Sequence, residues 1–325
     1  MTDVQPHTIA PTYQDRSTWL IVLGVFQVLI GLCVAGMTLL LTIEMAFVPA
    51  MKDVMNWRTM TPVLFPYVAL AVALVWLGIG SCLARRWAHA LTLVLSWMAL
   101  VMGMFAMVTM IATAGQLRQT LLAQQTMSAE MATAIQVITL AMMLAIYVLL
   151  PGVFVLFYQG KNVWATCQAK DPKRRWTDET PLPVLAMSLF LGFGAAFMPI
   201  TAFCHFAVPL FGVLLHGILG GLVCLTIAIV NVILAYQLYK LRPAAWWVAL
   251  IVLGLLSCSA TITFARIDLI DLYKHMDMPA KQLEQMRQMA PTMKAIMPWA
   301  TAVSSCAWVG YMLWIRRYFV AKEME

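Results

Sequence analysis

Eight long apolar stretches without a single charged residue constrain the fold of this chain more than any other feature. A bilayer has a hydrocarbon core about 30 Å thick, and a helix needs about 20 apolar residues to cross it because backbone groups there must be satisfied within the segment. The sequence therefore predicts an all-α polytopic membrane protein with eight transmembrane helices. They are expected at Thr18–Ile43, Val63–Leu83, Ala88–Ala112, Ala134–Phe157, Pro183–Phe203, Leu210–Tyr239, Ala244–Phe264 and Met297–Ile315.

The composition excludes a soluble protein of this length. Of 325 residues, 62% are hydrophobic and 11% are charged, whereas soluble domains average about 45–50% apolar and about 25% charged residues. The few charged side chains could not cover the surface of soluble domains with such apolar interiors. The lipid bilayer is therefore the first expected partner of the chain.

The distribution of Lys and Arg predicts the orientation of the helices. If the N-terminus is cytoplasmic, thirteen of the 21 basic residues fall in segments on the inner side, while the 14 acidic residues divide equally. Basic residues concentrate on the cytoplasmic side of membrane proteins, so both termini are expected in the cytoplasm and the chain in the cell (inner) membrane. This asymmetry accounts for the formal net charge of +7 without a nucleic-acid partner.

The two halves of the chain resemble each other at an offset of about 159 residues, with Trp87 matching Trp246. Each half contains four predicted spans, with a basic turn between the second and third. An even number of spans per half predicts two tandem parallel four-helix repeats. The expected organisation is a mobile cytoplasmic tail (1–17), the first repeat (18–157), a basic cytoplasmic linker (158–182), the second repeat (183–315) and a cytoplasmic tail (316–325).

Ionisable residues at the outer ends of the predicted spans form the first candidate site. If the seventh span continues as a helix, Asp268, Asp271 and His275 share one face, and carboxylates with imidazole can bind a cation or relay protons. Glu44 ends the first span and His205 ends the fifth, so they can line the same outward cavity between the repeats. The alternative is that these residues only mark the water boundary, with local ion pairs at a solvated helix end.

His216 is expected about two turns inside the sixth span. A histidine within a membrane often has a function on a substrate or ion path. The alternative is a structural hydrogen bond to a neighbouring helix. The adjacent G-x-x-x-G pattern of Gly217 and Gly221 predicts that another helix approaches closely here.

Methionine is concentrated in the predicted outer connections, which hold eleven of the 25 Met residues. Thioethers bind Cu(I), so His275, Met276 and Met278 form a candidate metal site. The alternative is that Met suits amphipathic helices at the membrane surface. Nothing in the sequence identifies another cofactor, and the cysteines show neither a C-x-x-C motif nor an outer pair.

Three classes of function remain open. The first is a non-enzymatic protein that binds or passes a small solute or cation at the outward site. The second is an accessory or assembly subunit, whose partners are other membrane subunits or further copies of itself. The third is an intramembrane enzyme; this class is disfavoured because the sequence contains no P-loop, G-x-S-x-G, H-E-x-x-H or Rossmann motif.

Overall fold

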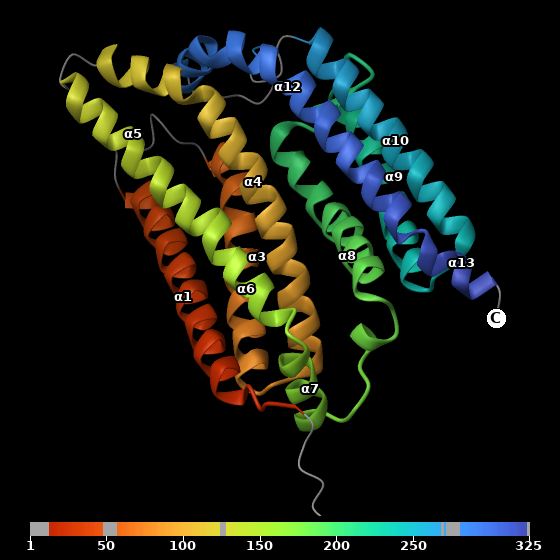
Figure 1. Ribbon diagram of the computed structural model, residues 1–325. Helices are drawn as coiled ribbons and strands as arrows, with labels where there is room; N and C mark the ends of the chain where they lie inside the picture. The colour runs from red at the N-terminus through yellow and green to blue at the C-terminus, as the bar shows by residue number, and fades with distance from the viewer. Residues whose placement is uncertain (1–12, 48–56, 124–127, 268–269, 271–279, 324–325) are drawn as a thin grey trace, which may run out of the picture. The chain divides into compact units, whose positions relative to one another are not determined.

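A computed structural model describes residues 13–47, 57–123, 128–267, 270 and 280–323 (Figure 1). Helices make up nearly all of this part of the chain, and one short antiparallel pair of strands interrupts them. The elements are α1 (Ser17–Phe47), α3 (Trp57–Cys82), α4 (Arg86–Ala123), α5 (Ala129–Leu144), η1 (Ala145–Leu149), α6 (Leu150–Tyr158), α7 (Lys161–Lys170), η2 (Trp176–Asp178), α8 (Leu182–Phe197), η3 (Met198–Cys204), β1 (Val208–Leu210), β2 (Val213–Leu215), α9 (Gly217–Tyr239), α10 (Pro243–Arg266), α12 (Ala280–Ile315) and α13 (Arg317–Glu323).

Seven helical segments in the described part of the chain are long and apolar enough to cross a membrane. The protein is therefore a multi-pass membrane protein. The expected eighth span, Met297–Ile315, lies within α12 but is not one of the seven. The seven segments are Ser17–Phe47, Met60–Cys82, Arg86–Gly115, Ala129–Tyr158, Leu182–Phe203, Gly217–Tyr239 and Pro243–Arg266.

The described residues belong to two compact units. The first unit comprises Met1–Leu32, Val72–Ala114 and Leu121–Asp178, and the second comprises Cys33–Ala71, Gly115–Thr120 and Glu179–Glu325. In the second unit, α8 packs against α9 and α10 packs against α12 (Figure 1). Its core is built from the buried apolar side chains of these helices, including Val184, Met187, Leu191, Leu234, Leu238, Trp246, Ala249, Met312 and Ile315.

In the first unit, the turn between α3 and α4 reverses the chain within three residues. Ala84 adopts the left-handed conformation with φ 47°, and the backbone N–H of Arg85 donates to Gly80 O at 3.0 Å. This is the bond of a Schellman motif, which satisfies a carbonyl that the end of the helix leaves without a partner. The turn therefore lets α4 begin at Arg86 with the end of α3 already capped.

In the second unit, the turn between α9 and α10 has the same construction. Leu241 is left-handed with φ 55°, and the backbone N–H of Arg242 donates to Gln237 O at 3.2 Å. The helix α10 then begins at Pro243. Proline is well suited to a first helical position because it has no N–H to satisfy and its φ is already helical.

A π-turn, η1, interrupts the span between Ala129 and Tyr158. Pro151 has no N–H, so it cannot donate to Tyr147 O four residues earlier as an α-helix requires. The wider turn re-pairs the backbone here, with Leu150 N–H donating to Ala145 O. Gly103 of α4 packs against this turn so closely that a Cβ placed on it would lie 1.9 Å from Tyr147 O.

The connection between α8 and α9 differs from the expected start of a helix at Leu210. Here β1 and β2 form an antiparallel hairpin in which Val208 pairs with Leu215, and α9 begins only at Gly217. Phe211 and Gly212 at its tip have positive φ values of 48° and 82°, which a continuous helix cannot accommodate. The apolar composition at this position therefore belongs to a hairpin, which the hydrophobic pattern could not distinguish from a helix.

Candidate functional site

Five residues of the predicted outer cluster lie outside the described residues: Asp268, Asp271, His275, Met276 and Met278. Their expected common face depended on the seventh span continuing as one helix. The helix α10 ends at Arg266, and Ile267 is extended with ψ 138°, so the seventh span does not continue as one helix through Ile267.

Glu44 and His205 occupy ends of predicted spans, as their sequence positions indicate. Glu44 lies in the last turn of α1 and is exposed. His205 follows η3, is exposed, and has a left-handed backbone with φ 51°. Both belong to the second unit.

His216 does not lie inside a span, contrary to the sequence-based expectation. It is the exposed residue that directly precedes α9, because the hairpin occupies the stretch expected to form the first turns of that helix. The backbone N–H of Gly217 donates to His205 O at 2.9 Å. This bond places His205 and His216 together at the base of the hairpin.

The glycines at the start of α9 accommodate this hairpin. A Cβ on Gly220 would lie 2.0 Å from Phe206 O, and a Cβ on Gly221 would lie 3.5 Å from the Phe206 ring. The expected close approach to the glycine-rich face therefore occurs, but the approaching group is the Phe206 backbone and not another helix. Phe206 itself, two residues before β1, is left-handed with φ 52°, a conformation that is strained for a residue other than glycine.

Two buried hydroxyls of α10 bind the other end of the hairpin. Phe211 N–H donates to Ser259 Oγ at 2.9 Å, and Gly212 N–H donates to Thr263 Oγ1 at 3.0 Å. These bonds satisfy backbone donors that would otherwise be costly in an apolar setting. The hairpin is therefore fixed at both ends, which sets the positions of the histidine backbones at its base.

Imidazole is a common ligand of transition-metal cations, and the bond from Gly217 N–H to His205 O brings the backbones of two histidines close together. Among the residues that the structure describes, no group of three or more His, Cys, Asp or Glu side chains could hold a metal ion. Additional ligands for a cation at His205 and His216 would thus come from water, from the solute itself or from the chain outside the described ranges.

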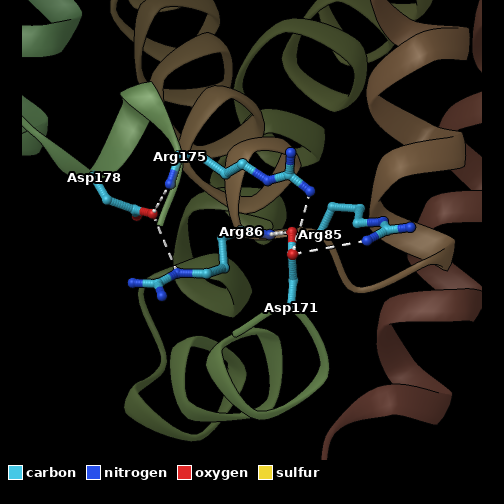
Figure 2. Close-up of polar contacts among 5 residues, drawn as sticks. All are labelled: Arg85, Arg86, Asp171, Arg175 and Asp178. Carbon is cyan, nitrogen blue, oxygen red and sulfur yellow. Dashed lines mark hydrogen bonds and ion pairs between the residues drawn. The ribbon is translucent and has the colours of Figure 1, made fainter. Parts of the chain in front are cut away.

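A second polar site, in the first unit, was not predicted from the sequence. Asp171 follows α7 in the linker and is only 2% exposed. Figure 2 shows three arginines around its carboxylate: Oδ2 accepts from the backbone N–H of Arg86 at 3.4 Å, and Oδ1 lies 3.7 Å from Arg85 Nη1 and 3.4 Å from Arg175 Nη2. The linker carboxylate therefore binds the turn between α3 and α4.

Asp178 makes a second connection to the same arginines. Its Oδ2 lies 3.2 Å from Arg86 Nε and accepts from the backbone N–H of Arg175 at 2.9 Å (Figure 2). The Arg86 guanidinium also lies over the Trp164 ring of α7, 5.3 Å from its centroid. We call Arg85, Arg86, Asp171, Arg175 and Asp178 the linker clamp.

Hydrogen bonds beside the linker clamp join the ends of the spans. His89 Nε2 donates to Tyr158 O at 2.8 Å, and Tyr158 OH donates to Ser81 Oγ at 2.8 Å. Arg16 N–H donates to Thr166 Oγ1 of α7 at 3.0 Å. The signal in the sequence was the coincidence of two linker aspartates with a double-arginine turn on the same predicted side of the membrane.

Cys167 of α7 lies behind the linker clamp and is fully buried. Burial, reinforced by the nearby Asp171 carboxylate, raises the pKa of its thiol to about 12. Because the thiolate is the reactive form of cysteine, Cys167 is a packing residue and not a nucleophile.

Compared with models of protein families, with curated proteins and with solved structures, the chain shows no match.

Proposed function

We propose that this protein is a non-enzymatic, multi-pass protein of the cell (inner) membrane that binds or passes a small solute or cation at an outward-facing site. The observation that carries the proposal is the hydrogen bond from Gly217 N–H to His205 O, which brings His205 and His216 together. Glu44, Asp268, Asp271 and His275 are the proposed further residues of the path. His275, Met276 and Met278 remain the candidate ligands for copper.

The choice of a cation as ligand rests on the two imidazole groups themselves. The chain contains no Asp, Glu, Lys or Arg between Thr180 and Tyr239. His205 and His216 are the two histidines of this long segment without charged residues. Neutral imidazole is a common ligand of divalent transition metals. The connection itself contains no arginine or lysine, although Arg266 of α10 lies beside Gly212 at the tip of the hairpin.

The experiment is a calorimetric titration of the detergent-purified, untagged protein with Co²⁺ and with Zn²⁺. His205→Ala and His216→Ala are each expected to weaken binding by about 10–100-fold, as losses around metal sites do. His7→Ala is the matched control and is expected to retain the affinity. Equal affinities in all three variants would remove the histidine pair from the site.

Uptake separates passage of a cation from binding alone. Proteoliposomes that carry the natural protein and enclose a metal-sensitive dye are expected to take up the cation. Proteoliposomes that carry His205→Ala are expected not to. Asp268→Asn combined with Asp271→Asn tests the rest of the proposed path, and protein levels must remain unchanged. Binding without uptake would restrict the proposal to a binding protein.

The two halves are proposed to be tandem parallel repeats. The turns after α3 and α9 support this, because Ala84 and Leu241 share the left-handed conformation and the same pattern of bonds. The fourth residue of each following helix, His89 or Trp246, donates a ring N–H to a backbone carbonyl, at Tyr158 and Met312 respectively. The supporting pairs are 157 positions apart (84 and 241, 89 and 246), so we pair Trp246 with His89 and not with Trp87.

Parallel repeats make a direct prediction about topology. If the eight proposed spans form them, the linker and both termini lie on one side of the membrane, and the excess of Lys and Arg in these segments makes that side the cytoplasmic one. A reporter that is active only outside the cell should therefore be silent when it is fused after Gly160 or after Glu325. Activity at either position would overturn the proposed orientation.

A role as an accessory or assembly subunit is the second candidate. An apolar groove on α8 and α9 in the second unit supports it, because close packing of helices in membranes favours small side chains. The groove is lined by Gly192, Ala195, Ala196, Ala228, Ile229, Val232 and Ile233. Native mass spectrometry of gently extracted protein tests this role: added mass from another polypeptide or a second copy supports it, and Ala196→Trp should then abolish the added mass.

A further inference from the structure

The charged residues of the linker divide into an inward set and an outward set. The carboxylates of Asp171 and Asp178 are buried in the linker clamp, where Figure 2 shows them directed at arginines. Lys170, Lys173 and Arg174 are all exposed. The acidic groups within residues 170–178 are therefore neutralised internally, and this segment presents cationic side chains to its surroundings.

This outward surface lies where membrane-spanning helices end. The helix α3 ends at Cys82, α4 begins at Arg86 and α6 ends at Tyr158. The linker is bound to two of these ends, through Asp171 to Arg86 and through the short connection that follows Tyr158. Residues held against the ends of spans lie at the depth of the lipid headgroups.

An aromatic side chain accompanies the three cations. Trp176 is 46% exposed and lies between Arg175 and Asp178 of the linker clamp. Tryptophan is enriched at membrane interfaces, where its ring lies at headgroup level, and basic residues near the ends of spans bind anionic lipids. We propose that Lys170, Lys173, Arg174 and Trp176 form a surface that binds the phosphate headgroups of anionic lipids.

The linker clamp gives this surface its shape before a lipid arrives. Asp171, which directly follows Lys170, accepts from Arg86 N–H. Arg175, which directly follows Arg174, donates its N–H to Asp178. A preformed surface loses less conformational freedom on binding than a flexible basic segment does. The lipid surface is independent of the histidine pair, so either proposal can fail alone.

Native mass spectrometry of the full chain from nanodiscs tests the lipid surface. The membranes contain phosphatidylcholine and phosphatidylglycerol in equal amounts, and the retained lipids are counted. Each cation near an anionic membrane contributes about fivefold to binding, so the triple variant Lys170→Gln, Lys173→Gln, Arg174→Gln is expected to lose about 100-fold in affinity for phosphatidylglycerol.

A control with the same loss of charge separates this surface from a general effect. Arg242→Gln, Arg287→Gln, Lys294→Gln removes three exposed cations elsewhere and is expected to retain the anionic lipid. The charge-preserving variant Lys170→Arg, Lys173→Arg, Arg174→Lys is expected to bind like the natural protein, and this result also shows that the surface tolerates substitution.

Three outcomes would overturn the proposal. The first is equal retention of phosphatidylglycerol by the triple variant and the control. The second is equal retention of phosphatidylcholine and phosphatidylglycerol by the natural protein. The third is displacement of the lipid by millimolar inorganic phosphate, which would identify a site for the free ion. A triple variant that elutes as an aggregate is replaced by the single variants, each expected to weaken binding by about fivefold.

Discussion

The backbone N–H of Arg86, the first residue of α4, donates to Oδ2 of Asp171 at 3.4 Å. The first amides of a helix have no partner within the helix, and the helix dipole favours a negative charge beside them. A linker carboxylate thus occupies the position at which a helix most readily accepts an anion. Because Asp171 also faces Arg85 and Arg175, one side chain joins the linker to the turn between α3 and α4.

We expect Asp171→Asn to destabilise the first unit strongly. The substitution keeps the shape of the side chain but removes the buried carboxylate charge that faces the half-exposed Arg85 and Arg175 and accepts from Arg86 N–H, and the loss of charged hydrogen bonds of this kind costs about 1.5–3 kcal/mol. The free energy of unfolding, measured by denaturant titration in detergent, should fall by that amount. Glu179→Gln is the control because Glu179 and its partner Lys240 are both exposed. It should change stability by less than about 1 kcal/mol.

The multi-pass class could be predicted from the sequence because hydrocarbon excludes charge in every span. Helix ends were less predictable where local bonds decide them. Cys82 and Arg86 flank a turn whose left-handed residue is Ala84, not glycine, so no residue type signalled it. The hairpin at Val208–Leu215 was also missed, because a short apolar run suits a strand and a buried helix equally.

The sequence indicated the residue types at both candidate sites but not the contacts between them. Counting the residues of the basic linker showed its net charge but could not show that Asp171 turns inward, since this depends on a bond to Arg86 85 positions away. His205 and His216 were both selected as ionisable residues beside spans. Their approach to each other follows from the hairpin, so only the structure relates them.

Gly103→Ala should be far more disruptive than its size suggests. A Cβ at Gly103 would lie 1.9 Å from Tyr147 O, a backbone atom that cannot move without displacing η1. Overpacking of this kind costs about 1–3 kcal/mol. Gly152→Ala in α6, within the span that also contains Tyr147, provides the comparison, because nothing lies within 4 Å of its added Cβ. Denaturant titration of both variants should show a loss only at Gly103, and equal stabilities would contradict the close approach.

Replacing alanine with glycine should have different effects at two buried positions of the first unit. At Ala84, relief of the left-handed conformation (φ 47°) is worth about 1 kcal/mol and offsets the lost burial of a methyl group, about 0.8 kcal/mol. At Ala90, inside α4, the lost burial adds to the lower helix propensity of glycine, about 1 kcal/mol. Ala84→Gly should thus leave the free energy of unfolding nearly unchanged, while Ala90→Gly should lower it by about 2 kcal/mol. Similar losses in both variants would contradict the strain at Ala84.

Cys167 should resist thiol reagents in the folded protein. Burial raises the pKa of its thiol to about 12, so at pH 8 only about one molecule in ten thousand carries the reactive thiolate. In a background without other cysteines, maleimide labelling of Cys167 should be negligible at pH 8 and should become complete after unfolding. The labelling rate in the folded protein should rise about tenfold for each pH unit, because the thiolate fraction does so below the pKa.

The control variant moves the thiol to the neighbouring exposed position, with Gln168→Cys combined with Cys167→Ala. It should label rapidly when folded. Rapid labelling of Cys167 itself at pH 8 would show that α7 opens from the linker clamp, because the buried thiol cannot otherwise reach the reagent.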